Sequence, residues 1–274
     1  MQRKHATVPI QELHLFDTCV TLGTLSSPAG YRSLTADAAL DVMDRYDIAE
    51  ALVVNSEARV RYPREAGNRR LLEWIDGVDR LHPVWVLDPI DDPDLPTARG
   101  MVADMLDAGV RVARLMMGKA PPFLWLWDNL CTVLEEHHVP CLLDFADTGR
   151  FSGPVTTQGV PDDTALDRLR DVCIAHPHLP MVLSHASGGV GLAFSTMALM
   201  RRAPNLHIDT TTMGGYWRRV ATGIGAERVV FGSGLPIYDP GMVVSMVQYS
   251  DDVDLATKKA ICSGNIVRLL EAVR

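Results

Sequence analysis

The chain has 274 residues, of which 47% are hydrophobic and 22% charged, and this composition excludes an intrinsically disordered protein. Its net charge of −8 argues against nucleic acid and anionic membranes as partners, because both bind clustered basic surfaces. One basic cluster covers residues 59–70, close to Glu57 and Glu65. We interpret it as a solvated loop followed by the start of a helix.

The five cysteines are far apart and form no Cys-x-x-Cys pair, which is typical of reduced thiols and not of a disulfide framework. No apolar run reaches the roughly 18 residues that a membrane span needs. The basic N-terminus, 1–4, is not followed by the apolar stretch of a signal peptide. We therefore expect a cytoplasmic protein with a small-molecule substrate and neither nucleic acid nor membrane as partner, and a homodimer is left open.

Eight short runs rich in Val, Leu and Ile recur along the chain, and each is apolar on consecutive positions. Strands that are buried on both faces have this pattern, whereas strands with one solvent-exposed face alternate apolar and polar residues. The predicted strands are, in chain order, 13–20, 51–55, 83–87, 110–116, 140–145, 180–184, 206–210 and 228–231.

Stretches with helical spacing of apolar residues separate these runs. In 36–46, for example, Ala39, Met43 and Tyr46 share one side, and Thr35 precedes the stretch as an N-cap. Helices are predicted over 36–46, 69–78, 102–106, 130–136, 166–175, 193–202 and 258–273.

Strand–helix alternation requires a mainly parallel sheet, because each crossover returns the chain to the same end. Eight such units close a (β/α)8 barrel, or TIM barrel, and about 250 residues make one domain of this kind. An open doubly wound sheet is the alternative, but residues 21–24, after the first predicted strand, match no glycine-rich phosphate loop. We predict an α/β fold in which residues 1–274 form a single TIM barrel.

Catalytic residues of such barrels lie at the carboxyl ends of the strands and in the loops that follow them. Arg111 and Arg114 are three apart on one predicted strand, so they point to opposite faces, and we expect Arg114 to point inward. The polar residues near strand ends are Asp17, Cys19, Thr21, Asn55, Glu57, Arg59, Asp88, Arg114, Lys119, Asp144, Asp147, His185, Ser187, Asp209, Thr210, Thr212, Ser233 and Asp239.

Several segments carry a resemblance to one family. FDTCVTLG (16–23) resembles the first-strand motif Asp-x-His-x-His-x-Gly, and ERVVFGSGLP (227–236) resembles the eighth-strand motif Gly-Ser-Asp-x-Pro. Three further regions resemble the family. Its second helix and third strand are similar to EAGNRRLLEWI and RLHPVWVLDP, its sixth strand to LPMVLSHASGG, and its closing helix to KKAICSGNIVRLL. In this order, the segments make the chain similar to the amidohydrolase-related family, which includes metal-dependent decarboxylases, hydrolases and lactonases.

The resemblance implies a metal site whose residues are mostly replaced in this chain. The family's two first-strand histidines correspond to Cys19 and Thr21, its fifth-strand histidine to Asp144 and its eighth-strand aspartate to Gly234, whereas His185 keeps the sixth-strand histidine. Catalytic zinc needs about three protein ligands. Because threonine is a poor ligand and glycine is none, we predict no metal cofactor.

We predict a hydrolase of this family that acts on a small carboxylated or carbonyl-bearing metabolite by metal-independent acid–base chemistry, with lactone or ester hydrolysis favoured. His185 is the expected acid or base, Asp144 its orienting partner and Cys19 a further catalytic group. Arg114 is expected to bind an anionic part of the substrate. Further expected substrate contacts are Asn55, Tyr216, Trp217, Arg218 and Asp239.

Two alternatives from other classes stay open. In a non-hydrolytic barrel, the inherited pocket would bind a ligand or catalyse an isomerisation or cyclisation by positioning alone. An atypical zinc hydrolase or decarboxylase would use Cys19, Asp144 and His185 as its ligands. Metal content, and activity in the presence of a chelator, distinguish these alternatives from the first prediction.

Overall fold

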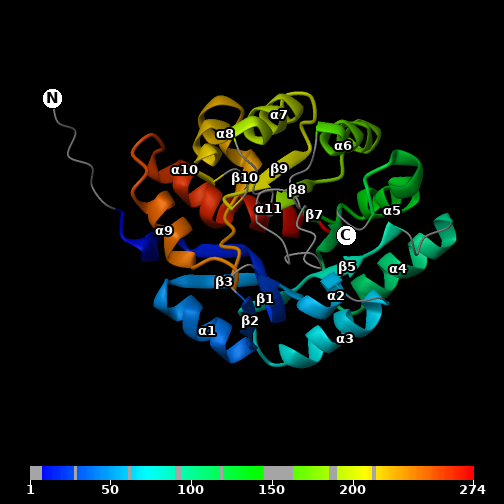
Figure 1. The fold of residues 1–274 in the computed structure, drawn as a ribbon, viewed down its shortest axis with the longest axis horizontal. Coiled ribbons are helices and arrows are strands. Elements are labelled where there is room, and N and C mark those ends of the chain that lie inside the picture. The colour runs from blue at the N-terminus through cyan, green and yellow to red at the C-terminus, as the bar shows by residue number, and fades with distance from the viewer. Residues whose placement is uncertain are drawn as a thin grey trace.

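In a computed structural model of the chain, helices surround a central ring of strands (Figure 1). The structure describes residues 8–27, 30–60, 63–89, 94–117, 120–144, 163–184, 190–211 and 214–274. Its strands are β1 (Leu15–Ser27), β2 (Gly30–Leu34), β3 (Ile48–Asn55), β4 (Leu81–Pro83), β5 (Trp85–Leu87), β6 (Ala113–Met116), β7 (Cys141–Asp144), β8 (Met181–Ser184), β9 (Leu206–Asp209) and β10 (Val229–Val230).

The helices alternate with these strands along the chain. They are α1 (Ala36–Arg45), α2 (Ser56–Val60), α3 (Arg64–Trp74), α4 (Leu95–Asp107), α5 (Leu124–Glu136), α6 (Asp163–Ala175), α7 (Val190–Met200), α8 (Trp217–Gly223), α9 (Pro240–Gln248), α10 (Leu255–Lys259) and α11 (Asn265–Glu271), with a π-helical turn (Ala260–Gly264) between the last two. No helix in the described ranges has both the length and the apolar character needed to cross a membrane.

The strands close into a TIM barrel. β4 pairs with β3 and β5 with β6, and Val84 alone separates β4 from β5, so these two short strands together make one barrel strand. Parallel pairing then runs in chain order from β5 to β10. The ring closes where the Thr18 N–H donates to the Phe231 carbonyl at 2.9 Å and the Gly234 N–H donates to the Cys19 carbonyl at 3.0 Å.

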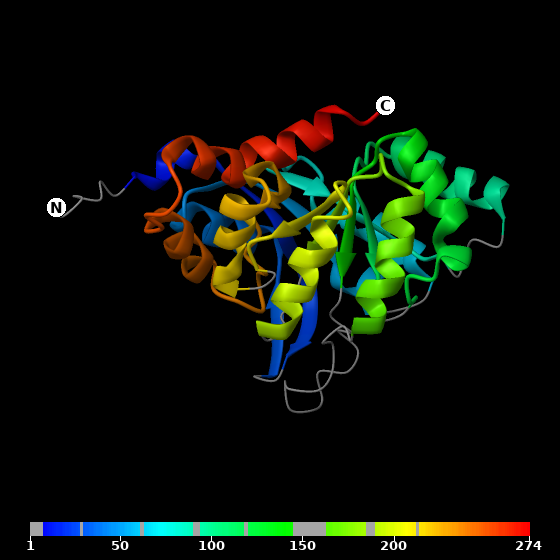
Figure 2. The ribbon, with the colours of Figure 1, turned by 90° about the horizontal axis from the view of Figure 1, so that it is seen from above.

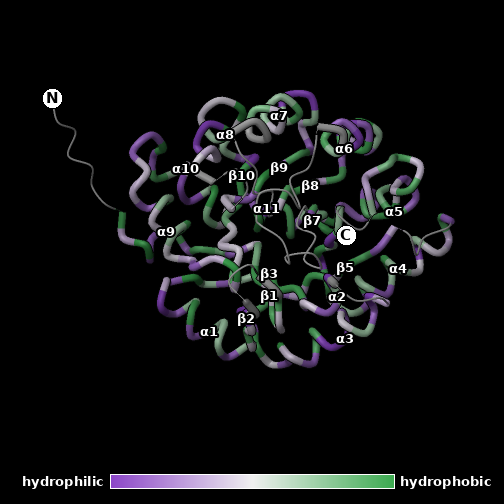
Figure 3. The backbone as a smooth tube through the Cα atoms, viewed as in Figure 1, coloured by the Kyte–Doolittle hydropathy of each residue, from purple (hydrophilic) through white to green (hydrophobic). Residues whose placement is uncertain are grey.

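Side chains of each barrel strand alternate between the barrel interior and the layer that faces the helices. Val54, Val86, Val182 and Val230 pack together inside the barrel with residues of α11, and their branched side chains suit the strand conformation. Figure 2 shows α11 across one end of the barrel and the β1–β2 hairpin projecting from the other. Hydrophobic residues dominate the central strands, whereas hydrophilic ones are frequent on the outer helices (Figure 3).

All eight predicted strands are confirmed, as is the predicted N-cap, since Thr35 Oγ1 accepts a hydrogen bond from the Ala38 N–H at 3.2 Å. Predicted helix boundaries were less accurate: the helix expected over 69–78 begins at Arg64, and the single closing helix is divided by the π-helical turn. The sequence patterns did not predict β2, α2, α8 or α9. β2 is polar and pairs antiparallel to β1 outside the ring, and α2 is too short to show a helical period.

Candidate active site

Among the residues that the structure describes, six ionisable side chains meet inside the barrel near the carboxyl ends of its strands, and we call them the buried ionic cluster. None is more than 1% exposed, so their charges depend on one another for compensation. The members are Asp17 and Cys19 of β1, Arg59 of α2, Arg114 of β6, Asp144 of β7 and Asp209 of β9.

Two guanidinium groups converge on one carboxylate oxygen at the centre of the cluster. Asp144 Oδ2 accepts hydrogen bonds from Arg59 Nη2 at 2.6 Å, from Arg114 Nε at 3.1 Å and from Arg114 Nη2 at 2.8 Å. Arg59 Nη1 also donates to Thr21 Oγ1 at 2.7 Å, so this one side chain links β1 to β7 across the interior. Charge-assisted hydrogen bonds of this kind are roughly twice as strong as neutral ones.

Asp17 lies at the seam that closes the barrel. Its Oδ1 accepts hydrogen bonds from the Cys19 N–H and from the Ser233 N–H, each at 2.9 Å. Burial raises the pKa of Asp17 to about 6, and the nearby charge of Asp209 adds to this rise, although the hydrogen bonds from Ser233 and Cys19 oppose it. Asp17 therefore exchanges its proton closer to neutral pH than an ordinary aspartate does.

Cys19 is a protonated thiol in this environment. Burial raises the pKa of Cys19 well above its ordinary value, and the Asp209 carboxylate raises it further, whereas Arg114 opposes the shift. A Cβ atom added at Gly232 would lie 3.1 Å from the Cβ atoms of both Cys19 and Asp209, so only glycine lets the backbone approach this closely. Because the thiolate is the reactive form of cysteine, this setting disfavours nucleophilic or metal-binding roles for Cys19.

Arg59 reaches the interior because α2 is held firmly against the barrel. Arg64, at the start of α3, donates from Nη1 to the carbonyls of Ala58 and Arg59 at 3.0 and 3.1 Å. Its Nη2 also donates to Asp88 Oδ2 at 2.9 Å, an ion pair whose side chains are only 7% and 4% exposed. Arg64 thus satisfies carbonyls at the end of α2 and joins that end to the loop after β5.

The start of α2 is fixed as well. Asn55, the last residue of β3, accepts a hydrogen bond at Oδ1 from the Glu57 N–H at 2.7 Å. Asn55 is fully buried, and within the described ranges its Nδ2 has no hydrogen-bond partner. The Asn55 amide nitrogen is therefore a buried donor that a bound molecule could use, which keeps Asn55 a candidate substrate contact.

Comparison with known proteins shows which family the chain belongs to. Residues 25–272 match the sequence model of a family described as amidohydrolase. The chain belongs to the amidohydrolase family. This confirms the resemblance seen in the sequence motifs, and members of the family are enzymes. Among curated proteins, no sequence matches this chain.

Solved structures of low sequence identity share its fold. A 2,6-dihydroxybenzoate decarboxylase from Rhizobium is 16% identical over 94% of this chain and 98% of that chain, with a TM-score of 0.72. A 5-carboxyvanillate decarboxylase from Sphingomonas paucimobilis is 14% identical over 96% and 100%, with a TM-score of 0.71. A dihydroxybenzoic acid decarboxylase from Polaromonas sp. JS666, solved with bound manganese and an inhibitor, is 17% identical over 94% and 96%, with a TM-score of 0.68.

Only some of the residues predicted for the active site lie together in the structure. Asp144, Cys19 and Arg114 belong to the buried ionic cluster, and Arg114 points inward as expected, while Arg111 is exposed. The Arg114 guanidinium is engaged with Asp144, so substrate binding by Arg114 requires this ion pair to open or to share its donors. His185 lies outside the described residues, and its role stays a prediction.

Other predicted substrate contacts lie outside the cluster. Trp217 is fully buried among the apolar residues of the core between barrel and helices, and it is not part of the buried ionic cluster. Tyr216 packs edge-on against the ring of Phe194, and Arg218 lies 3.5 Å from Asp252 at the surface. Asp239 is exposed and caps α9 by accepting a hydrogen bond from the Gly241 N–H at 2.8 Å, a structural role that accounts for its position after the eighth strand.

The interpretation of residues 59–70 as a solvated basic segment is wrong for its most important members. Arg59 is 0% exposed and Arg64 is 6% exposed, and both are paired with buried carboxylates. Arg69 and Arg70 are exposed, as the interpretation required. The spacing of charges along the sequence did not distinguish the buried arginines from the exposed ones, because their partners Asp88 and Asp144 lie far from residues 59–70 in the chain.

The described residues do not fit a divalent metal ion. Within the described ranges, no group of three or more His, Cys, Asp or Glu side chains is arranged to hold one. Of the predicted zinc ligands, Cys19 is held as a thiol, and Asp144 Oδ2 already accepts three hydrogen bonds from guanidinium groups. The Arg59 guanidinium lies between Thr21 and Asp144, and its charge repels a metal cation at that place.

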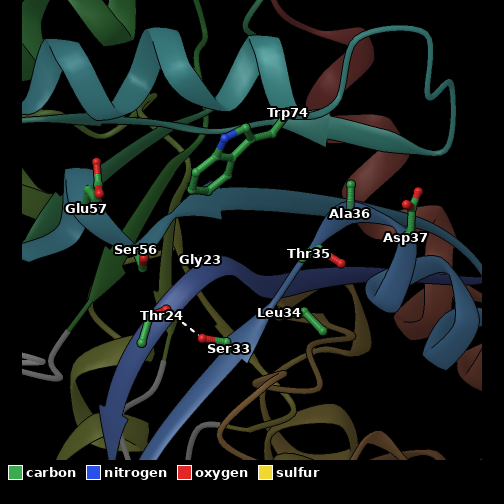
Figure 4. Close-up of a pocket in the computed structure, with 10 residues that line it drawn as sticks. All are labelled: Gly23, Thr24, Ser33, Leu34, Thr35, Ala36, Asp37, Ser56, Glu57 and Trp74. Atoms are coloured by element: carbon green, nitrogen blue, oxygen red, sulfur yellow. Dashed lines mark hydrogen bonds between the residues drawn. The ribbon is translucent and has the colours of Figure 1, made fainter.

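A separate cavity of 710 Å³ lies beside the β1–β2 hairpin and contains no member of the buried ionic cluster. In Figure 4, the Trp74 ring lies beside Ser56 and Gly23 in the lining of this cavity, and Thr24 Oγ1 and Ser33 Oγ form a hydrogen bond of 2.6 Å. The cavity borders the first turn of α2, whereas Arg59 lies at the other end of the same helix.

Close packing of α3 on α2 yields a prediction about stability. A Cβ atom at Gly67 would lie 2.6 Å from the Ala58 backbone nitrogen, so Gly67→Ala forces the two helices apart. We expect the free energy of unfolding to fall by about 1–3 kcal/mol, measured by urea denaturation. Gly100 in α4 has open space around its Cα, so Gly100→Ala is the matched control and is expected to be neutral or stabilising. Equal effects of the two substitutions would contradict the prediction.

Proposed function

We propose that this amidohydrolase acts on a small carboxylated or carbonyl-bearing substrate by acid–base chemistry that uses no divalent metal, with lactone or ester hydrolysis favoured. The supporting observation is the convergence of ionisable side chains from β1, α2, β6, β7 and β9 near the carboxyl ends of the strands. Enzymes of this fold carry their catalytic residues there, and groups with strongly shifted pKa values concentrate at functional sites.

Hydrolysis of a lactone or ester needs a base for the attacking water, an acid for the leaving oxygen and donors for the developing oxyanion. His185, which follows the last residue of β8, is the proposed acid or base on the basis of the sequence. Among the described carboxyl groups, Asp17 is suited to exchange a proton, because its pKa is about 6. The guanidinium groups of Arg59 and Arg114 supply positive charge for the oxyanion.

Decarboxylation of an aromatic carboxylate is the second candidate. It is supported by the shared fold with decarboxylases of two benzoate-type substrates and by the two buried guanidinium groups, whose fork geometry suits carboxylates. In this reaction the C–C bond to the carboxyl group breaks, CO₂ leaves, and a proton from an acidic group takes its place on the ring carbon.

A substrate panel with two arms tests both candidates. The purified chain, with EDTA present throughout, is incubated with lactones and aryl esters in one arm and with hydroxylated benzoates in the other. We expect turnover in the hydrolytic arm, with a loss of about 10²–10⁴-fold in His185→Gln. The exposed His178, changed in His178→Gln, is the matched control and should retain the rate. Turnover of benzoates alone favours decarboxylation, and activity that appears only when a metal is added contradicts the proposal.

A further inference from the structure

The structure holds two guanidinium groups against Asp144, a position at which the family resemblance implies a metal-binding histidine, and a neighbour of the same fold was solved with bound manganese. We infer that the guanidinium groups of Arg59 and Arg114 replace a divalent metal ion electrostatically, and that Arg59 is the built-in central cation. The inference rests on one part of the proposed function, that the reaction uses no divalent metal, and it names the residues that supply the positive charge instead.

Charge in the interior supports this assignment. Among the described residues of the barrel interior, the carboxyl groups of Asp17, Asp144 and Asp209 are fully buried, and the two guanidinium groups that lie among them bring the same charge as one divalent ion. A buried carboxylate is stable only when a cation or several donors compensate it. With both guanidinium groups present, a further divalent ion would meet repulsion in a region of low dielectric constant.

Hydrogen-bond geometry supports it as well. Arg59 binds Thr21 on β1 and Asp144 on β7, the positions that correspond in the family's sequence pattern to metal-binding histidines. One planar guanidinium thereby connects two strands on different sides of the barrel, as a coordinated ion would. Unlike a metal ion, it cannot dissociate from the chain. Burial lowers the pKa of Arg59 and the Asp144 carboxylate opposes this shift, but an arginine side chain is not deprotonated in proteins.

The surroundings of α2 keep this cation in place. Arg64 binds the carbonyls of Ala58 and Arg59 and pairs with Asp88, and Gly67 allows α3 to pack directly on the α2 backbone. A helix of only five residues has little stability of its own, so these contacts position the Arg59 side chain. Arg64 and Gly67 are positioning residues in this sense.

The first part of the test measures metal binding by the full-length wild-type chain. The chain is incubated with excess Mn²⁺ or Zn²⁺ and dialysed, and its metal content is then measured by plasma mass spectrometry. We expect less than about 0.1 ion per chain, and a melting temperature that EDTA changes by less than about 1 °C. About one ion per chain, lost in Asp144→Asn, would overturn the inference.

The second part removes the built-in cation. Arg59→Met is expected to lower the melting temperature by about 10 °C, because it removes one of the two guanidinium groups that bind the buried Asp144 carboxylate. Methylguanidinium, tested at about 10 mM, should raise the melting temperature of Arg59→Ala more than that of the wild type, because it fills the vacated place. Arg99→Met is the control, since Arg99 pairs with Glu136 at the surface, and it should cause little change.

Each outcome separates this inference from the proposed function. If Arg59→Met yields no folded protein, Arg59→Lys decides, because it retains the charge without the fork: recovery of folded protein supports the inference, and no recovery contradicts it. An unchanged melting temperature in Arg59→Met also contradicts it, and leaves the proposed reaction untouched. A folded, metal-free chain without turnover on the substrate panel contradicts the proposed function alone.

Discussion

Replacing Asp144 with asparagine is expected to lower the free energy of unfolding by about 3–5 kcal/mol, the largest stability effect that we predict for one charged residue. The substitution leaves two fully buried guanidinium groups without the carboxylate that they share, and the neutral amide cannot compensate both charges. Urea denaturation followed by tryptophan fluorescence, with linear extrapolation to water, measures the change.

The control for this substitution is an ion pair at the surface. Glu136 binds Arg99 through both carboxylate oxygens, at 2.6 and 2.8 Å, but the two side chains are 43% and 49% exposed. Solvent screens such pairs, so Glu136→Gln should cost less than about 1 kcal/mol. If Asp144→Asn costs no more than Glu136→Gln, the buried ionic cluster does not contribute to stability as its geometry implies.

The barrel was predictable because each strand can be identified from its own short segment of sequence. A strand covered by helices outside and by other strands' side chains inside must be apolar at consecutive positions, and this requirement appears directly in segments such as those of β7 and β8. The β1–β2 hairpin was not predictable in this way. It extends beyond the barrel, and its sequence mixes polar and apolar residues, so it lacks the consecutive apolar positions of the barrel strands.

The candidate site was only partly predictable, because charge pairing depends on the fold. The end-of-strand rule identified Asp144 and Arg114 as candidates, and both lie in the cluster. Arg59 stands in a basic segment that looks solvated, and only the turn of α2 reveals that its side chain points inward. Asp239 satisfied the same rule for a different reason, since helix caps also favour aspartate just after a strand.

Trp217 shows a second limit of sequence reasoning. An aromatic residue after a barrel strand suits either a substrate pocket or the packing of the next helix, and its position in the chain is the same in both cases. The structure places Trp217 at the start of α8, with its side chain buried among the apolar residues of the core between barrel and helices, which identifies the packing role. The surroundings of the side chain, and not the type of residue, separated the two roles.

Asp17 provides the second large expected effect, a dependence of stability on pH. Its pKa is raised from 3.8 to about 6 in the folded chain, chiefly by burial, so the folded state holds this proton more tightly than the unfolded state. The stabilisation from this proton is fully present below about pH 3.8 and is lost as the pH rises through about 6. The whole effect amounts to about 3 kcal/mol, at 1.36 kcal/mol for each pKa unit.

Asp17→Asn isolates this contribution, because the amide keeps an oxygen that can accept the hydrogen bonds from the Cys19 and Ser233 N–H groups but carries no titratable proton. Its NH₂ group enters a buried site, so an offset in stability that does not vary with pH is expected. We therefore compare slopes: from about pH 4 to about pH 7, the variant should gain about 2 kcal/mol on the wild type, measured by urea denaturation at each pH. Asp171→Asn, at an exposed carboxylate, serves as the control and should run parallel to the wild type. Parallel curves for Asp17→Asn as well would mean that the Asp17 carboxyl group is solvated or compensated in solution. Its pKa would then not be raised by burial at the barrel seam.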